Sequence, residues 1–258
     1  MGGGSRVRPA GVRAPLDACN PTAKLAVLFA VSCAVLVLFE PLPLLALYLL
    51  ALAGVRGGAG VAWPMLLVAQ VPFVAFGVGV VAVNALSRPG EPLVEGLPVR
   101  ITVEGLSVGL ALAIRGLLIG VMSIGFIATT APRALMVSLV QHARLSPQFA
   151  YALLAGHRML AGMPQQWSTI VAAHSVRAPL RRDGRSRFGV GDFSRCAFAL
   201  LVSSIRSSER IALALESRGL GAGPRTIWRP VPLGARDALL GLIVLGPVSA
   251  VVAATVLR

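Results

Sequence analysis

Charged residues are scarce in this sequence. Only 13% of its 258 residues are Asp, Glu, Lys or Arg, whereas 56% are hydrophobic, and the mean hydropathy is +0.80. The apolar share of a soluble domain normally stays nearer half of its residues. The shortage of charge therefore argues against a soluble domain and indicates an integral membrane protein.

Catalytic and metal-binding patterns are missing as well. The three cysteines are scattered, without a Cys-x-x-Cys pair, so neither a metal site nor a disulfide framework is expected. The sequence has no Walker A loop, no Gly-x-Ser-x-Gly and no His-Glu-x-x-His, the usual signatures of ATPases, serine hydrolases and zinc proteases. We therefore expect a chain without catalytic residues, bound metal or cofactor.

The charge that is present is strongly unbalanced, with 24 Lys and Arg against 10 Asp and Glu and a net charge of +14. A basic protein can bind nucleic acid. However, fourteen arginines and only four acidic residues lie within residues 131–235, and apolar stretches flank that block. Cytoplasmic segments of membrane proteins keep positive charge in this way. We therefore expect the block to lie in the cytoplasm and not to bind nucleic acid.

Five apolar segments are predicted to cross the bilayer, for which a helix needs about 20 residues. They cover residues 23–39, 42–55, 61–86, 106–129 and 238–257. The second is the shortest, and we expect the Arg56-Gly57-Gly58 sequence that follows it to be a loop. Pro64 and Pro72 should kink the third segment.

The predicted fold is an all-α membrane protein with about five transmembrane helices and long amphipathic cytoplasmic helices inserted before the last one. The slightly acidic segment 87–104 suits the outer face, and the C-terminus would then lie outside. The expected parts are a cytoplasmic tail (1–22), four transmembrane helices (23–130), a cytoplasmic helical region (131–235) and a last transmembrane helix (236–258).

Prolines and glycines divide the basic region into three predicted helices. These cover residues 133–142, 147–177 and 192–218. Pro164 lies inside the second helix. The third has Asp192 or Ser194 as its predicted N-cap and ends before Gly219. Its apolar residues form one stripe and its arginines lie off that stripe, so we expect it to pack on one face and display arginine on the other.

Two of these helices end on an arginine. The second ends Val176-Arg177-Ala178, and the third ends Glu216-Ser217-Arg218-Gly219. Arginine in a last turn complements the helix dipole. Alternatively, each guanidinium is a fixed fork for an acidic or carbonyl-lined groove on another protein. The candidate partner-binding residues are therefore Arg177, Ala178, Glu216, Arg218 and Gly219.

Arg115 lies near the middle of the fourth apolar segment, where an unpaired charge is costly. It could pair across the bundle with Asn84 or a backbone carbonyl, extend toward the outer face, or take part in transport. The same segment has small residues every three or four positions, which permits close helix packing within the chain or with another subunit. These are Gly105, Gly109, Ala113, Gly116 and Gly120.

Several short motifs follow one another along the chain. They are Asp17 with Asn20-Pro21 and Lys24, then Arg115, Thr129-Thr130-Ala131-Pro132, Pro147 with Arg158, Arg177, and the run from Glu209 to Thr226 that contains ERIALALESRGL. In these motifs, and over nearly all of its length, the sequence resembles the transmembrane T component of energy-coupling factor (ECF) transporters, the CbiQ/EcfT family.

The resemblance implies a non-catalytic subunit in the cell membrane that works with two ABC-type ATPase subunits and an S component, a small membrane protein that binds a vitamin or a metal ion. The cytoplasmic helices would dock on the ATPases with Arg177 and Arg218 as anchors, and their movement would release substrate inside. The first tip reads Val-Arg-Ala and the second Ser-Arg-Gly, whereas the family usually has Ala-Arg-Gly or Ala-Arg-Ser.

The alternative is a stand-alone secondary transporter or another polytopic membrane protein. Secondary transporters often contain inverted repeats and ionisable or broken-helix sites near the midplane. No internal repeat is visible, and Arg115 is the only charge in the middle of a predicted span. The transported substrate does not follow from the sequence, because in this architecture the S component selects it.

Overall fold

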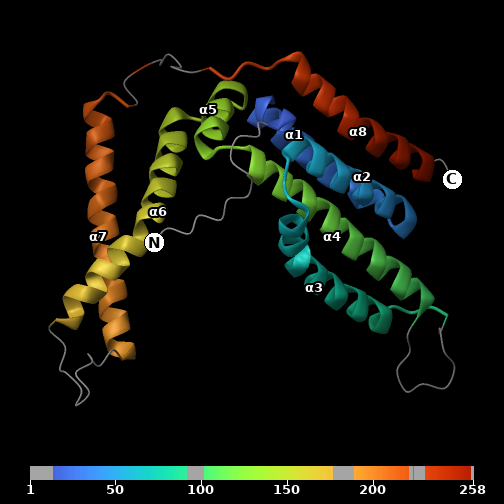
Figure 1. The fold of residues 1–258 in the computed structure, drawn as a ribbon, viewed down its shortest axis with the longest axis horizontal. Coiled ribbons are helices and arrows are strands. Elements are labelled where there is room, and N and C mark those ends of the chain that lie inside the picture. The colour runs from blue at the N-terminus through green and yellow to red at the C-terminus, as the bar shows by residue number, and fades with distance from the viewer. Residues whose placement is uncertain (1–13, 92–101, 177–188, 221–222, 224–229, 257–258) are drawn as a thin grey trace. The chain divides into compact units, whose positions relative to one another are not determined.

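The computed structural model describes residues 14–91, 102–176, 189–220, 223 and 230–256. Within these residues the chain is helical (Figure 1). The elements are η1 (Pro15–Ala18), α1 (Pro21–Ala34), η2 (Val35–Val37), α2 (Pro41–Ala59), α3 (Trp63–Ser87), α4 (Val103–Thr129), α5 (Pro132–His142), α6 (Pro147–Ser175), α7 (Val190–Ser217) and α8 (Ala235–Val256).

The chain divides into two compact units, which are described separately. Unit 1 comprises residues 1–135 and 231–258, and unit 2 comprises residues 136–230. The predicted boundaries at residues 130 and 235 lie close to this division in the sequence. Which parts lie on which side of a membrane stays a prediction.

Unit 1 contains the apolar helices. By length and composition, α2, α3, α4 and α8 could each cross a membrane, and residues 21–37 form a shorter apolar helix. The predicted all-α membrane fold is therefore confirmed, and each of the five predicted apolar segments is helical. The prediction that the second segment is the shortest was wrong, because α2 has 19 residues and α1 has 14.

Helix α2 is longer than predicted because it continues through Arg56-Gly57-Gly58, for which the sequence predicts a loop. A Cβ on Gly58 would lie only 2.8 Å from the side chain of Leu16 in η1. Because glycine has no Cβ, Leu16 can pack closely against α2 at this position. The helix ends instead at Gly60, whose φ of 64° is the left-handed conformation that glycine adopts readily.

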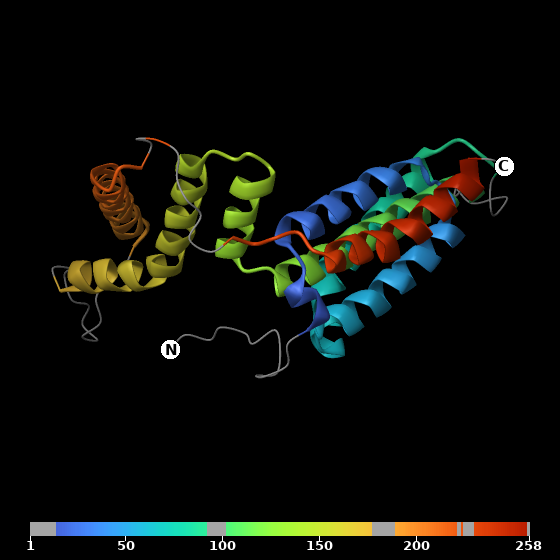
Figure 2. The same ribbon diagram turned by 90° about the horizontal axis from the view of Figure 1, so that it is seen from above.

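Helix α4 is the centre of unit 1 and packs against α3 and α2, while α1 packs against α8 and α4 (Figures 1 and 2). Two clusters of buried aliphatic side chains hold these helices together. The larger joins α1, α2, α4 and α8, and the smaller includes Val55, Leu66 and Val121. Many large apolar side chains of α2 and α3 face outward, as expected where lipid rather than water surrounds a bundle.

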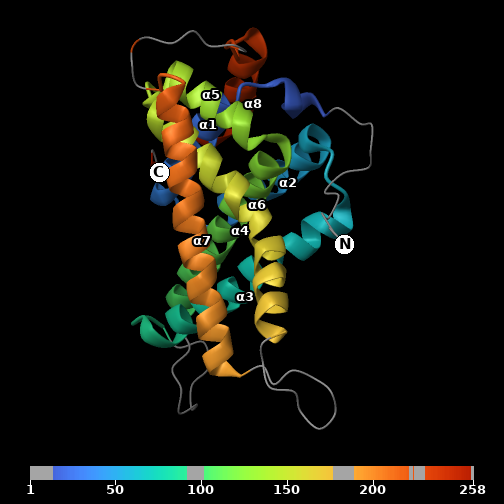
Figure 3. The ribbon, with the colours of Figure 1, turned by 90° about the vertical axis from the view of Figure 1, so that its left-hand side faces the viewer.

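Unit 2 contains α6 and α7, which lie beside each other (Figure 3). Helix α6 is bent along its length (Figure 2), and Pro164 inside it removes a backbone hydrogen bond. The rings of Trp167 and Phe193 meet edge to face, with centroids 5.2 Å apart. This contact joins the second half of α6 to the first turn of α7.

Helices α6 and α7 are referred to as the arms. The predicted N-cap of α7 was wrong. Gly189, not Asp192 or Ser194, is the N-cap of α7. The Asp192 carboxylate instead lies in the first turn and accepts a hydrogen bond of 3.0 Å from the Gly189 N–H. An acidic group in this position also complements the positive end of the helix dipole.

Candidate functional site

The end of α7 is a fully formed helix C-cap. The N–H of Gly219 donates to the Glu216 carbonyl at 2.8 Å, and the N–H of Leu220 donates to the Leu215 carbonyl at 2.9 Å. Together with the φ of 74° at Gly219, these bonds form a Schellman motif, which satisfies the last carbonyls through the backbone. The geometry requires glycine at 219 but makes no comparable demand on the side chain at 218.

Arg218 and Glu216 are exposed at this helix end. Their side chains therefore lie on the surface next to a backbone that two hydrogen bonds hold in one conformation. Since the backbone is already fixed, only the side chain would have to be ordered when such a guanidinium binds a groove on another protein. Of the arm residues singled out from the sequence, Glu216, Arg218 and Gly219 are brought together here.

The other predicted tip cannot be compared with this one, because Arg177 and Ala178 lie outside the described residues. Helix α6 ends at Ser175, and Val176 is its C-cap. The Ser175 hydroxyl donates to the Ala172 carbonyl at 2.8 Å, so the described end of α6 is also closed by local hydrogen bonds.

The surface of α7 has both an apolar and a basic part. Phe198, Leu201 and Ile205 are exposed along one stripe. Arg206 and Arg210 are exposed as well, and Arg210 donates to the Ser207 hydroxyl at 2.8 Å. An amphipathic helix with both parts accessible is suited to a contact with a membrane protein or lipid on one side and an acidic partner on the other.

Within unit 1, Arg115 pairs with backbone carbonyls. Its guanidinium donates to the carbonyls of Leu38 at 2.5 Å and Leu36 at 3.4 Å, and it lies 5.4 Å from the centroid of the Phe39 ring. The Asn84 amide, which the sequence also offered as a partner, donates to Val80 in its own helix. Arg115 thus joins α4 to the turn between α1 and α2.

The small residues of α4 face α3 of the same chain at several positions. A Cβ at Gly109 would lie 2.9 Å from the Val81 Cα, and one at Gly120 would lie 2.9 Å from the Phe73 ring. A Cβ at Gly105 would lie 3.0 Å from the Ala85 Cα and closer still to the Asn84 carbonyl oxygen. Gly116 differs, because no described atom comes within 4 Å of the position of its Cβ.

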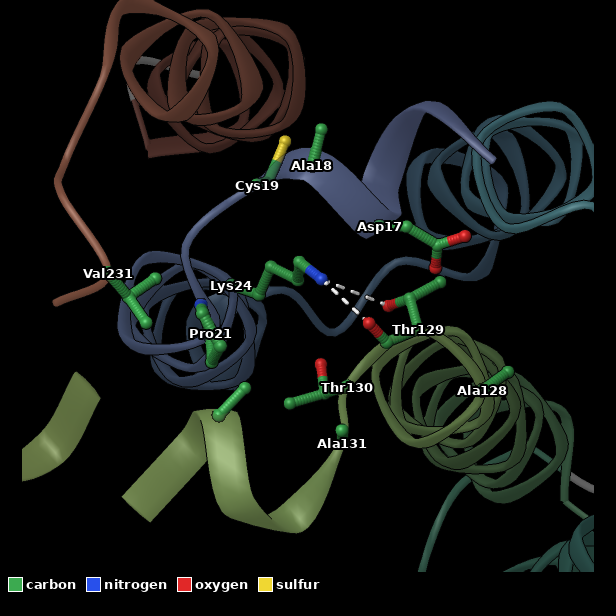
Figure 4. Close-up of a pocket in the computed structure, with 11 residues that line it drawn as sticks. Asp17, Ala18, Cys19, Pro21, Lys24, Ala128, Thr129, Thr130, Ala131 and Val231 are labelled. Atoms are coloured by element: carbon green, nitrogen blue, oxygen red, sulfur yellow. Dashed lines mark hydrogen bonds between the residues drawn. The ribbon is translucent and has the colours of Figure 1, made fainter. Parts of the chain in front are cut away.

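The motif residues near the N-terminus meet those at the end of α4 in a pocket of about 490 Å³ (Figure 4). Asp17, Cys19, Lys24, Thr129 and Thr130 contribute to its lining. The Lys24 ammonium donates to the carbonyl and the hydroxyl of Thr129. Burial raises the pKa of the Cys19 thiol, and the nearby Asp237 carboxylate raises it further, against the opposing charges of Lys24 and Arg236.

Sequence reasoning missed Asp237 as part of this cluster. One oxygen of its carboxylate accepts the Asn20 N–H at 2.6 Å and the other accepts the Gly234 N–H at 2.9 Å. The available signal was an acidic residue in front of an apolar run, which is a common feature of helix N-termini. That pattern does not indicate that Asp237 binds Asn20, which lies 217 residues away in the sequence.

Comparison with known proteins relates this chain to a family of transport proteins. The family model for CbiQ, described as a cobalt transport protein, matches residues 13–226. The chain is also 25% identical, over 174 residues, to a protein of Bifidobacterium longum (strain NCC 2705) that is named as an ABC transporter ATP-binding protein. That alignment covers 64% of this chain and 22% of the relative, so the chain spans less than a quarter of the relative's length.

Proposed function

The chain belongs to the CbiQ family of cobalt transport proteins, and from this we propose that it is the transmembrane coupling subunit of an ECF-type ABC importer. In this proposal it links ATP hydrolysis by two ABC-type ATPase subunits to substrate release from a vitamin- or metal-binding S component. The chain itself does not hydrolyse ATP, and the S component selects the substrate.

The observation that carries the proposal is the end of α7. Arg218 is exposed next to Glu216 on a helix end whose carbonyls are already satisfied through Gly219. The guanidinium lies on the surface, and an acidic or carbonyl-lined groove on another protein is its chemical complement. We propose the same role for Arg177 and Ala178 at the end of the preceding arm helix.

The relative from Bifidobacterium longum supports a partnership with ATP-binding subunits. A protein named for ATP binding contains a segment similar to this chain, in 22% of its length. A segment of this type and an ATP-binding function therefore occur within one polypeptide. In the proposed importer the same two parts are separate chains that associate through the arms.

The proposed orientation places the N-terminus and residues 131–235 in the cytoplasm. The fourteen arginines and four acidic residues of that region support it, because positive charge is retained on the cytoplasmic side. The apolar helices of unit 1 would hold the S component within the cell membrane.

The test is co-purification of the tagged chain with its two ATPase subunits, combined with uptake measurements in cells. Truncating a buried interfacial charge costs about 2–5 kcal/mol, so Arg218→Glu should weaken the complex by at least about tenfold. Arg88→Glu is the matched control, since it makes the same charge change at an exposed arginine in the segment predicted to lie on the outer face. If Arg177→Glu combined with Arg218→Glu leaves both the complex and uptake intact, the proposal is wrong.

A further inference from the structure

Three segments that are distant in the sequence meet where the chain leaves unit 1 and where it returns. Helix α4 ends at Thr129, a few residues before the chain leaves unit 1 at Leu135, and the chain returns at Val231 just before α8. Thr129 and Val231 both lie beside the start of α1 (Figure 4). All the residues that hold them together belong to unit 1.

Asn20 holds the returning segment. Its side-chain amide donates to the carbonyls of Val231 at 2.9 Å and Pro232 at 3.4 Å, and its backbone N–H donates to Asp237 at 2.6 Å. The oxygen of the same side chain accepts the Thr22 N–H and so caps α1. Asn20 is 1% exposed, so losing any of these bonds would leave buried polar groups unsatisfied.

Lys24 holds the departing segment. Its ammonium donates to the carbonyl of Thr129 at 3.0 Å and to the hydroxyl at 3.4 Å, and the side chain is 7% exposed. Thr129 is the last residue of α4, where a cation complements the negative end of the helix dipole. Lys24 is also the only lysine of the chain. Burying this charge is costly unless the pairing is retained.

Asn20 is the N-cap of α1 and Lys24 lies in its first turn. The N-terminal end of one helix therefore binds both the segment that follows α4 and the segment that precedes α8. These bonds add noncovalent links between α1 and each end, beside the covalent connection of the backbone. With them, a displacement at either end acts directly on α1, and through it on α8 and α4, against which α1 packs.

We infer that Asn20, Lys24 and Asp237 form a positioning clamp that transmits movement of the arms to α1. This inference rests on the proposed function, because it assumes that nucleotide binding by the ATPases moves the arms. The three residues would act through α1, as positioning residues. If these residues only stabilised the fold, substituting them would lower the stability of the protein. The arms and α1 would then still respond to nucleotide together.

The experiment is hydrogen–deuterium exchange on the full chain in complex with its two ATPase subunits, with and without ATP plus vanadate. In the wild type, nucleotide should change the exchange rates of both α7 and residues 21–30. In Lys24→Met the change in α7 should persist, while the change in residues 21–30 should fall by at least half. Lys24→Arg retains the charge and the donors and should restore the response.

Ser32→Ala is the control in the same helix, since the Ser32 hydroxyl donates to Leu28 within α1. It should behave like the wild type. Asp237→Leu removes both carboxylate acceptors at a similar side-chain size and gives a second route to the same result should Lys24→Met fail to fold. Equal responses of residues 21–30 in the wild type and both clamp variants would overturn the clamp, as would a wild type in which only α7 responds. If α7 does not respond, or no ATPase complex forms, the proposed function itself fails.

Discussion

The guanidinium of Arg115 donates a hydrogen bond of 2.5 Å to the backbone carbonyl of Leu38. Arg115 lies about halfway along α4, and Leu38 is the C-cap of the 3-10 turn that follows α1. Because α1 is short, the carbonyls of the 3-10 turn that follows it lie beside the middle of α4. The terminal guanidinium nitrogen of Arg115 binds two of these carbonyls.

We expect Arg115→Met to destabilise the protein. Hydrogen bonds to charged groups contribute about 1.5–3 kcal/mol, and the variant would leave the carbonyls of Leu36 and Leu38 without this donor. The thermal midpoint in detergent should fall by about 3–10 °C for a chain of this size. Phe39→Leu, which removes only the cation–π contact, should cost about 0.5–1 kcal/mol. An unchanged midpoint for Arg115→Met would contradict the pairing.

Two glycines of α4 should respond oppositely to the same change. A Cβ at Gly109 would lie 2.9 Å from the Val81 Cα, which is backbone and cannot move aside, so Gly109→Ala should cost about 1–3 kcal/mol. Gly116 has open space at that position, so Gly116→Ala should be neutral or gain up to about 1 kcal/mol from helix propensity. Thermal unfolding of both variants in one detergent tests this, and equal effects would argue against close α3–α4 packing at Gly109.

Hydrophobicity was sufficient to place all five apolar helices, because in a membrane protein the length of an apolar run decides whether a helix forms there. The Arg56-Gly57-Gly58 sequence was misassigned because a charge followed by two glycines usually marks a loop. Here Leu16, from a segment 42 residues earlier, packs against Gly58 and makes the glycine part of the helix. Local sequence contains no information about such a neighbour.

Some features of the candidate site could also be predicted from the sequence, and others could not. The stop at Gly219 could be predicted, since only a left-handed residue closes a Schellman motif readily. The separate motifs around Asn20, Lys24 and Thr129 could be recognised, but not that they meet. Their junction with Asp237 depends on the fold bringing together segments more than 200 residues apart.

The contact between α6 and α7 should depend on Trp167. Its ring meets that of Phe193 edge to face, and such pairs contribute about 0.5–1.5 kcal/mol beyond the area they bury. Trp167→Ala should therefore make the arms more sensitive to limited proteolysis, measured as a higher rate of cleavage within unit 2. Phe198→Ala removes an aromatic ring that is 67% exposed on α7, the helix of Phe193, and should leave the rate unchanged. If the two variants are cleaved equally fast, the Trp167–Phe193 contact does not hold the arms together.

The pH dependence of Cys19 alkylation should report separately on the charges of Asp237 and Lys24, two residues of the clamp. Burial raises the pKa of its thiol, Asp237 raises the pKa further, and Lys24 and Arg236 lower it. Because the thiolate is the reactive form, the alkylation rate should reach half of its maximum at a higher pH than for a free cysteine. Peptide mass spectrometry after maleimide treatment distinguishes Cys19 from Cys33 and Cys196.

Substitutions at Asp237 and Lys24 should move this midpoint in opposite directions. Asp237→Asn removes a charge that disfavours the thiolate, so the Cys19 pKa should fall and the midpoint should shift to lower pH. Lys24→Met removes a charge that favours the thiolate, so the midpoint should shift to higher pH. A substitution that simply exposed Cys19 to water would lower the pKa in both variants. Shifts of the same sign would therefore show that the cluster opens, and opposite shifts that it keeps its geometry and loses one charge at a time.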